Sequence, residues 1–413
     1  MRIGIVTAWG DCGAGYVSKA YADVLSASGE VFILAWGGGG RGDPFWSGAN
    51  VEWAVPHSAL TGIHRANMKH WIRRHRLDAV IFNEQRHWGA VLAARDAGIQ
   101  VGAYIDYYRV DTVGLFRLYD FLVCNTKRHY SAFLWHPQCL YVPWGTDCRT
   151  FRPQRSEQPR PVTFFHSGGW GGPNDRKGTG LALRAFTRVS GDARLVLHIQ
   201  SPLKRRAPDW AAIIAADERI MVRTGTVKPP CLYHLGDVYV YPCKLDGIGL
   251  SVPEALACGL PVIAPAWAPW NEFVTMATGT LLDVVAETGR QDGYHWPEVR
   301  VSEEAVTAAM QRYVDDPALL CTQATAARQY AESSLDWSRN SEALAALIAR
   351  CRRLECAGEL CRQAGEADAQ MNPTIAQSWI RANRRIVAYV ASPLTRRLSR
   401  LAGPVRSRFR QGS

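Results

Sequence analysis

Residues 237–272 constrain the fold more than any other part of this 413-residue chain. Four β-forming residues at 238–241 predict a short strand that is buried on both faces. A glycine-containing loop follows, and the run that begins at Ser251 carries helix-start signals. Residues 262–264 then begin another strand. A strand, a loop, a helix and a strand in this order form the repeating unit of a doubly wound parallel sheet.

Two carboxylates flank this loop: Asp246 lies just before Gly247, and Glu254 lies in the first turn of the predicted helix. A loop that leads into a helix presents unpaired backbone N–H groups, which attract anions such as phosphate. Carboxylates instead accept hydrogen bonds from hydroxyl groups, so a ligand with both phosphate and sugar hydroxyls fits best. The alternative is structural, because Ser251 and Glu254 also have the spacing of a capping box.

The string DGIGLSVPEALACGLPVIAP at residues 246–265 resembles the signature of retaining family 4 glycosyltransferases of the GT-B fold. Asp246 stands where that family usually has Glu, and Ile248 where it usually has Phe. The resemblance implies that Glu254 holds the ribose hydroxyls of a nucleotide-sugar donor and that Asp246 contacts the transferred sugar. It also implies that the donor and its phosphates lie against the loop residues Gly247, Ile248, Gly249 and Leu250.

A second segment, Arg176-Lys177-Gly178, precedes an amphipathic run and resembles the Lys-Gly of the same family. There the lysine contacts the donor diphosphate, which implies this role for Lys177. A fixed cation stabilises the negative charge that a leaving nucleoside diphosphate gains as the glycosidic bond breaks. The family's usual Arg after the preceding strand is missing, and Arg176 is our candidate to replace it. A solvated charge pair is the alternative.

The N-terminus predicts a strand at residues 2–8, a glycine loop and a helix, which is a βαβ opening of Rossmann type. It lacks the Gly-x-Gly-x-x-Gly fingerprint, which argues against a nicotinamide enzyme. The loop resembles the family's N-terminal glycine loop, so Gly13 and Gly15 are expected beside the donor. Asp106 follows the predicted strand 101–105, where the family often has a donor-contacting His. We expect Asp106 to hold a sugar hydroxyl or the acceptor, and a loop-capping role is the alternative.

Strands and helices alternate along the remaining chain. The expected fold is therefore α/β of GT-B type, with two Rossmann-like, doubly wound domains that face a central cleft. Residues 141–153 resemble the family's link between domains. This places an acceptor domain at residues 1–153 and a nucleotide-sugar domain at residues 154–340. A return helix, expected at residues 342–354, and a basic amphipathic tail follow within residues 341–413.

The basic tail carries most of the formal net charge of +11, because nine arginines and no acid follow Asp368. Its apolar residues recur at helical spacing, and a basic amphipathic helix can lie on an anionic membrane, gaining about 1 kcal/mol per Arg near the surface. We therefore expect residues 373–413 to contact an anionic membrane. Packing against the body or a partner helix is the alternative, and nucleic acid ranks last.

The eleven cysteines show no disulfide framework and no Cys-x-x-Cys pair, which argues against a secreted scaffold and a metal cluster. Without an Asp-x-Asp tripeptide, we expect no metal and no cofactor besides the donor substrate. No export signal or spanning segment is recognised. The expected location is cytoplasmic, peripheral at the inner face of the membrane.

These features lead to one main hypothesis, a retaining glycosyltransferase that moves a sugar from a nucleotide diphosphate sugar to an acceptor hydroxyl. The first choice of acceptor is a lipid-linked or cell-envelope glycan, and the second is a modified base in DNA. A different class is a catalytically inactive protein that binds nucleotide sugars. It stays open because Asp246 replaces the usual Glu and no His lies near Asp106.

Overall fold

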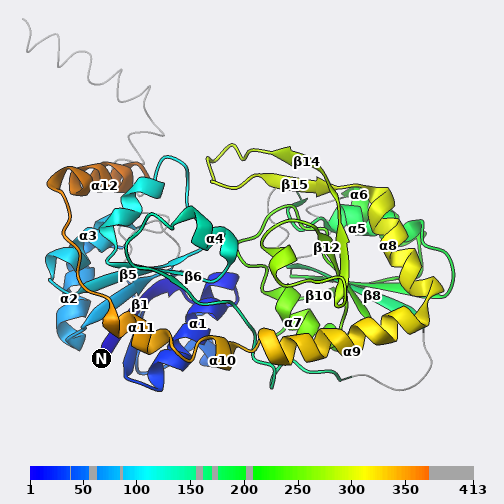
Figure 1. Ribbon diagram of the computed structural model, residues 1–413, viewed down its shortest axis with the longest axis horizontal. Helices are drawn as coiled ribbons and strands as arrows, with labels where there is room; N and C mark the ends of the chain where they lie inside the picture. The colour runs from blue at the N-terminus through cyan, green and yellow to red at the C-terminus, as the bar shows by residue number, and fades with distance from the viewer. Residues whose placement is uncertain are drawn as a thin grey trace, which may run out of the picture.

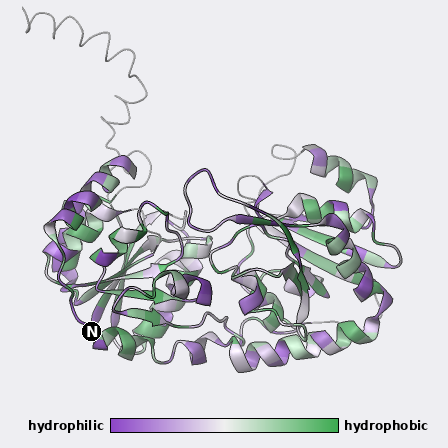
Figure 2. Ribbon diagram, turned by 45° about the horizontal axis from the view of Figure 1, so that its top comes forward, coloured by the Kyte–Doolittle hydropathy of each residue, from purple (hydrophilic) through white to green (hydrophobic). Residues whose placement is uncertain are grey.

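The computed structural model describes residues 1–37, 39–54, 63–83, 87–154, 161–169, 175–200 and 208–371. They form two α/β bodies that lie side by side, each built on its own parallel sheet (Figure 1). The strands are largely apolar, while hydrophilic residues are frequent on the helices that surround them (Figure 2). This pattern follows from the sheets, because strands covered by helices on both faces must be hydrophobic throughout.

The N-terminal body is built on a seven-stranded parallel sheet with the order β3-β2-β1-β4-β5-β6-β7. Its strands are β1 (Arg2–Ala8), β2 (Glu30–Gly37), β3 (Val51–Trp53), β4 (Ala79–Phe82), β5 (Gln100–Ile105), β6 (Phe121–Cys124) and β7 (Cys139–Tyr141). Its helices are α1 (Gly13–Ser26), α2 (Arg65–His75), α3 (Trp88–Asp96) and α4 (Lys127–Ala132), with the short 3-10 turns η1 (Pro44–Trp46) and η2 (Val113–Leu118). The strand order reverses between β1 and β4, which is where such sheets leave a crevice for ligands.

The C-terminal body is built on a six-stranded parallel sheet with the order β10-β9-β8-β11-β12-β13. Its strands are β8 (Val162–Gly169), β9 (Ala193–Ile199), β10 (Ile220–Thr224), β11 (Val238–Val240), β12 (Val262–Pro265) and β13 (Gly279–Leu282). Its helices are α5 (Thr179–Thr187), α6 (Pro208–Ala216), α7 (Ser251–Ala257), α8 (Glu303–Asp315) and α9 (Pro317–Ser334), with the 3-10 turns η5 (Tyr233–Leu235) and η6 (Trp270–Glu272). The residues of β11 are fully buried, so the predicted strand at 238–241 is confirmed.

A two-stranded antiparallel hairpin, β14 (Val284–Thr288) and β15 (Glu298–Val301), extends from the C-terminal body toward the N-terminal body (Figure 1). Its tip, residues 289–297, pairs with the segment that follows β5 through a bridge between Arg109 and Tyr294. This hairpin was not predicted from the sequence.

The chain returns from the C-terminal to the N-terminal body through α10 (Trp337–Asn340) and α11 (Leu344–Arg350). The Trp337 indole N–H donates to the carbonyl of Ala20 in α1 at 3.2 Å. The predicted return helix is therefore present, but it is shorter than expected, because residues 351–357 are not helical.

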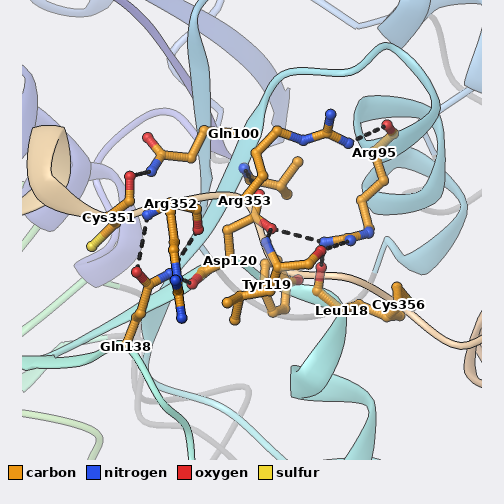
Figure 3. A network of polar contacts seen from close by, with 12 residues as sticks. Arg95, Gln100, Leu118, Tyr119, Asp120, Gln138, Cys351, Arg352, Arg353 and Cys356 are labelled. Carbon is orange, nitrogen blue, oxygen red and sulfur yellow. Dashed lines mark hydrogen bonds and ion pairs between the residues drawn. The ribbon is translucent and has the colours of Figure 1, made fainter.

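Side chains of the N-terminal body explain why this helix ends early (Figure 3). The Leu354 amide donates to the buried carboxylate of Asp120 at 2.8 Å, and Arg95 donates to the Leu354 carbonyl at 2.6 Å. Gln138 exchanges hydrogen bonds with the Arg352 backbone in both directions. These bonds satisfy the backbone N–H and C=O groups of an extended segment. Helical hydrogen bonds are therefore not needed to satisfy them.

Beyond this segment, α12 (Gly358–Met371) packs against α3 and η2 of the N-terminal body. The predicted basic tail at residues 373–413 lies outside the described residues. Within the part of the chain that the structure describes, no helix is both long enough and apolar enough to cross a membrane.

Candidate active site

A cavity of about 590 Å³ lies between the two bodies and is lined by both. Its size is within the range of pockets that hold small ligands. The N-terminal body contributes the glycine loop before α1 and the end of β5. The C-terminal body contributes the loop before α7, and the hairpin tip contributes three residues. Ten of the predicted site residues line the cavity: Asp246, Lys177, Asp106, Glu254, Gly247, Ile248, Gly249, Leu250, Arg176 and Gly13.

The two glycines of the N-terminal loop have different environments. A side-chain carbon added to Gly13 would lie 4.0 Å from the Leu250 side chain, so this loop faces the loop before α7 across the cavity. Gly15 does not line the cavity. A carbon added there would lie 2.2 Å from the Gly10 carbonyl oxygen. Gly15 therefore lets α1 begin close against its own preceding loop, which is a packing role.

Asp246 lies at the centre of a charged cluster. Its carboxylate accepts from Arg176 Nη1 at 2.8 Å, from Lys177 Nζ at 2.5 Å and from the Tyr241 hydroxyl. Burial opposes ionisation of Asp246, but the charges of Lys177 and Arg176 outweigh it and hold its pKa well below the usual range. Two cations against one carboxylate leave a net positive charge at this wall of the cavity, which favours an anionic ligand.

Glu254 is the second predicted acid, and its environment differs from that of Asp246. Its Oε2 accepts a hydrogen bond from the Tyr233 hydroxyl at 2.6 Å. Burial raises the pKa of Glu254 to about 7, although this hydrogen bond and the charge of Lys177 oppose the shift. The two acids of the motif therefore differ in charge near neutral pH.

The capping-box alternative for Glu254 is not what the structure contains. Leu250 occupies the N-cap position of α7 and makes no side-chain cap, while Ser251 is the first helical residue. The Glu254 carboxylate bonds to Tyr233 instead of to the backbone at the helix start. Glu254 is therefore available to the cavity.

Asp106 reaches the loop before α7 from the opposite body. A side-chain carbon added to Gly247 would lie 1.5 Å from Asp106 Oδ1, so only glycine fits at position 247 in this arrangement. The Asp106 carbonyl accepts from the Tyr294 hydroxyl at 3.1 Å. Asp106 and Gly247, which the sequence places in different domains, are thus in direct contact.

The hairpin is the largest part of the site that the sequence analysis missed. The rings of Tyr294 and Tyr107 stack at a centroid distance of 5.1 Å. Backbone hydrogen bonds join Val110 to Gly293 and His295 to Tyr108, each at 3.1 Å. A signal was present, because the Asp-Gly pair at 292–293 lies between two β-forming runs, which is typical of a hairpin.

The residues of α4 were also missed. The Arg128 guanidinium donates to the carbonyls of Asp246, Gly247 and Ala268 in the C-terminal body. In return, the Glu272 carboxylate accepts from the backbone amides of Lys127 and Arg128 at 2.5 and 2.9 Å. No motif marks these positions in the sequence.

A separate ion pair joins the two bodies at another point of the cavity wall. Lys228, in the segment that follows β10, lies 2.8 Å from carboxylate oxygens of both Asp11 and Asp43. Its ammonium group also lies 4.7 Å from the centre of the Phe45 ring. The cavity is thus bordered by contacts between the bodies at α4, at the hairpin and at Lys228.

Comparison with protein families gives a match to the model described as "Glycosyl transferases group 1" over residues 162–292. This range contains the loop before α7, both acids and the Arg176-Lys177 pair. Residues 162–292 are therefore similar to the group 1 glycosyl transferases. The resemblance that the sequence motifs indicated is confirmed over this range.

Curated relatives of this chain are named for phosphatidylinositol mannosides. A GDP-mannose-dependent alpha-(1-6)-phosphatidylinositol dimannoside mannosyltransferase of Mycobacterium tuberculosis is 25% identical over 225 residues, which cover 52% of this chain and 57% of the relative. A GDP-mannose-dependent monoacylated alpha-(1-6)-phosphatidylinositol monomannoside mannosyltransferase of Corynebacterium glutamicum is 25% identical over 244 residues, covering 54% and 59%. The match thus spans less than two thirds of either relative.

Solved structures of glycosyltransferases share the fold of this chain. Anabaena Alr3699/HepE in complex with UDP and glucose aligns with a TM-score of 0.66 at 13% identity, over 84% of this chain and 99% of that chain. WaaG, a glycosyltransferase involved in lipopolysaccharide biosynthesis, aligns with a TM-score of 0.61 at 16% identity. The alignment covers 84% of this chain and 100% of WaaG. The predicted GT-B fold with two Rossmann-like sheets is confirmed.

Proposed function

We propose that this chain transfers a hexosyl group from a nucleotide diphosphate sugar to an acceptor hydroxyl in the cavity between the two bodies. The observation that carries the proposal is the cluster of Arg176, Lys177 and Asp246, which leaves a net positive charge on the wall beside the loop before α7. Phosphate is the anion that this wall and the adjacent loop backbone would hold.

Lys177 and Arg176 would act on the leaving group. As the glycosidic bond breaks, the diphosphate gains negative charge next to these two cations. The Lys177 ammonium is already fixed by Asp246 and, at 2.7 Å, by the Tyr241 hydroxyl, so it needs little reorganisation during the reaction. A preorganised charge in a partly buried site stabilises the transition state more than a mobile one does.

Asp246 would still be able to hold the transferred sugar. A carboxylate offers about four lone-pair positions, and Asp246 uses three of them on Arg176, Lys177 and the Tyr241 hydroxyl. The remaining position on Oδ1 can accept from one sugar hydroxyl. This supports the role that the family resemblance implies, with Asp in place of Glu.

Glu254 and Asp106 would bind hydroxyl groups of the substrates. Glu254 lies next to Tyr233 in the cavity lining and would bond the ribose hydroxyls of the donor. Asp106 comes from the opposite body and touches the loop at Gly247, and it would bind a hydroxyl of the sugar or of the acceptor. In this proposal the two cations supply the positive charge at the diphosphate, and no metal ion is required.

The proposed stereochemistry is retention of the anomeric configuration, with a donor phosphate oxygen taking the acceptor proton on the same face. This part rests on the resemblance to retaining family 4 enzymes. The anomeric coupling of the product, measured by proton NMR before mutarotation, tests it. An inverted product would contradict this part and leave the transfer reaction standing.

The proposed acceptor is a lipid-linked or cell-envelope glycan. Two observations support it: similar relatives are named for phosphatidylinositol mannosides, and nine arginines follow Asp368 in a chain segment suited to an anionic surface. We accordingly propose a peripheral protein at the inner face of the cytoplasmic membrane.

The deciding experiment is donor hydrolysis by the full chain. GDP-mannose is tested first, because the relatives are named for it, and UDP-glucose, ADP-glucose and dTDP-glucose follow. We expect slow release of free sugar from one donor and protection against heat by the matching nucleoside diphosphate. If no donor is hydrolysed but one nucleotide binds, the protein is an inactive binder. If none binds, the proposal fails.

A further inference from the structure

A chain of hydrogen bonds runs from the hairpin, through the N-terminal body, to the loop before α7. The Trp296 indole lies on the hairpin and donates to the Tyr108 hydroxyl. The Tyr108 hydroxyl lies 3.1 Å from His129 Nδ1, and His129 Nε2 lies 3.1 Å from the Gly247 carbonyl oxygen. Tyr108 and His129 are both buried. Hairpin and loop are therefore connected through two side chains of the other body.

The proton positions in this chain follow from the groups at its ends. Burial, together with the charge of Arg128, lowers the pKa of His129 well below the usual range, so its ring is neutral. A carbonyl oxygen only accepts, so His129 carries its proton on Nε2 and donates to Gly247. Nδ1 then accepts from the Tyr108 hydroxyl, which in turn accepts from Trp296. Every donor in the chain points toward the loop.

Arg128 acts on the same loop from the same helix. Its Nη2 donates to the carbonyls of Asp246 and Gly247, the latter at 3.0 Å. Its guanidinium also lies 5.4 Å from the centre of the Trp296 ring on the hairpin. Arg128 and His129 do not line the cavity, so the carbonyls of Asp246 and Gly247 bond to groups that lie outside its lining.

This arrangement matters for a diphosphate ligand. A carbonyl oxygen turned into the cavity would repel phosphate, and Gly247 has the conformational freedom to turn. Donors at Arg128 and His129 hold the Gly247 carbonyl in one orientation, and the following loop residues 248–250 line the cavity.

We propose that Arg128 and His129 are positioning residues that set the donor-binding orientation of the loop before α7, and that the hairpin supports them through Trp296 and Tyr108. This inference rests on the proposed function. It makes donor binding by one body dependent on contact with the other, so the donor site is complete only when α4 and the hairpin are in place.

The test compares nucleoside diphosphate binding by full-length variants, using isothermal titration with whichever of GDP, UDP, ADP and dTDP the wild-type chain binds. Tyr108→Phe removes one hydroxyl without changing the ring. We expect it to weaken nucleotide binding about 3- to 10-fold, which corresponds to the loss of one hydrogen bond. Arg128→Met removes donors to three carbonyls, and we expect weakening on the order of 100-fold. Arg128→Lys restores one donor and should recover part of this loss.

A matched control separates positioning from stability. Tyr313 is also buried, and its hydroxyl donates to Gln323 Oε1 at 2.5 Å, away from the cavity. Tyr313→Phe should lower Tm about as much as Tyr108→Phe does, while leaving the nucleotide Kd unchanged. Two variants test His129. His129→Gln keeps a side chain that can donate and accept, so it should bind nucleotide more tightly than His129→Leu.

The outcomes are distinct. Weaker binding by Tyr108→Phe and Arg128→Met, with normal binding by Tyr313→Phe, supports the inference. Wild-type Kd values in Tyr108→Phe and Arg128→Met overturn it while the proposed function stands. A wild-type chain that binds none of GDP, UDP, ADP and dTDP overturns the proposed function, and the inference falls with it.

Discussion

Asp106 and Gly247 belong to different sheets, yet a side-chain carbon at position 247 would lie only 1.5 Å from the Asp106 carboxylate oxygen. The end of β5 and the loop before α7 are therefore in contact across the cavity. Any side chain at 247 must move the Asp106 carboxylate, the loop or both. Displacements of about 1 Å near reacting groups can cost on the order of 100-fold in rate.

We therefore expect Gly247→Ala to lower kcat/KM on the order of 100-fold with little change in Tm. The matched control is Gly365→Ala in α12, because a carbon added there meets nothing within 4 Å. Initial rates of sugar release and thermal unfolding measure the two effects. Equal activity of Gly247→Ala and wild type would show that the contact with Asp106 is irrelevant to catalysis.

Asp106→Asn keeps the shape of the side chain and removes its charge. If Asp106 holds a reacting hydroxyl, kcat should fall by about 10²- to 10⁴-fold while the donor KM changes little. The nucleotide Kd serves as the internal control, because the proposed phosphate contacts are on the other body. A variant that loses donor affinity but keeps kcat would place Asp106 outside the chemistry.

Glu254 should make stability depend on pH. Burial raises its pKa from the ordinary 4.5 to about 7, so the folded state favours the neutral acid. The stability that this contributes is fully present below about pH 4.5 and is lost as pH rises through 7. Between pH 4.5 and pH 8, the free energy of unfolding of the wild type should fall relative to that of Glu254→Gln. The fall should be at most about 3 kcal/mol.

Thermal unfolding of both proteins between pH 4.5 and 8 measures this difference. Gly365→Ala changes no titratable group and is the control, so its difference from wild type should stay constant with pH. GDP should release protons on binding if ribose hydroxyls donate to Glu254, because this favours the ionised form. A pH-independent difference between wild type and Glu254→Gln would contradict the raised pKa.

Lys177→Met removes the cation that lies 2.5 Å from Asp246. We expect kcat/KM for the donor to fall by about 10²- to 10³-fold, because a charge at the leaving diphosphate is lost. Lys69→Met on α2, where the lysine pairs with Asp96 at the surface, is the control and should keep full activity. Steady-state kinetics with the active donor give the answer, and unchanged kcat/KM would exclude a diphosphate role for Lys177.

Chelation should leave the reaction unaffected. Because Lys177 and Arg176 are proposed to supply the positive charge at the diphosphate, we expect donor hydrolysis to be equal in EDTA and in added Mg²⁺ or Mn²⁺. Rates in dialysed protein with and without each ion measure this. Loss of activity in EDTA that returns with one ion would require a metal at the diphosphate.

A chain that ends at residue 371 should lose membrane binding. With about 1 kcal/mol per Arg near an anionic surface, we expect the nine arginines of the tail to hold the full chain on vesicles. We expect the full chain to sediment with phosphatidylglycerol vesicles but not with phosphatidylcholine vesicles. The truncated chain should stay in solution with an unchanged Tm, and equal binding by both chains would contradict a role for the tail.

The sequence determined the elements whose signals are local. Strands such as β4 and β6 begin and end where their apolar runs do, because a buried strand needs apolar residues throughout. The loop before α7, with Asp246 and Glu254, was recognisable because its glycines and acids lie within one short string. Lys177 beside its glycine was recognisable for the same reason.

Only the tertiary structure decided how these parts meet. Three contacts join segments that are far apart in the chain. Asp106 contacts Gly247, Arg128 and His129 donate to the loop before α7, and the hairpin packs on the end of β5. The early end of the return helix likewise depends on Asp120 and Gln138 of the other body. Local propensity carries no information about such partners, because the free energy that fixes them arises when the two bodies pack together.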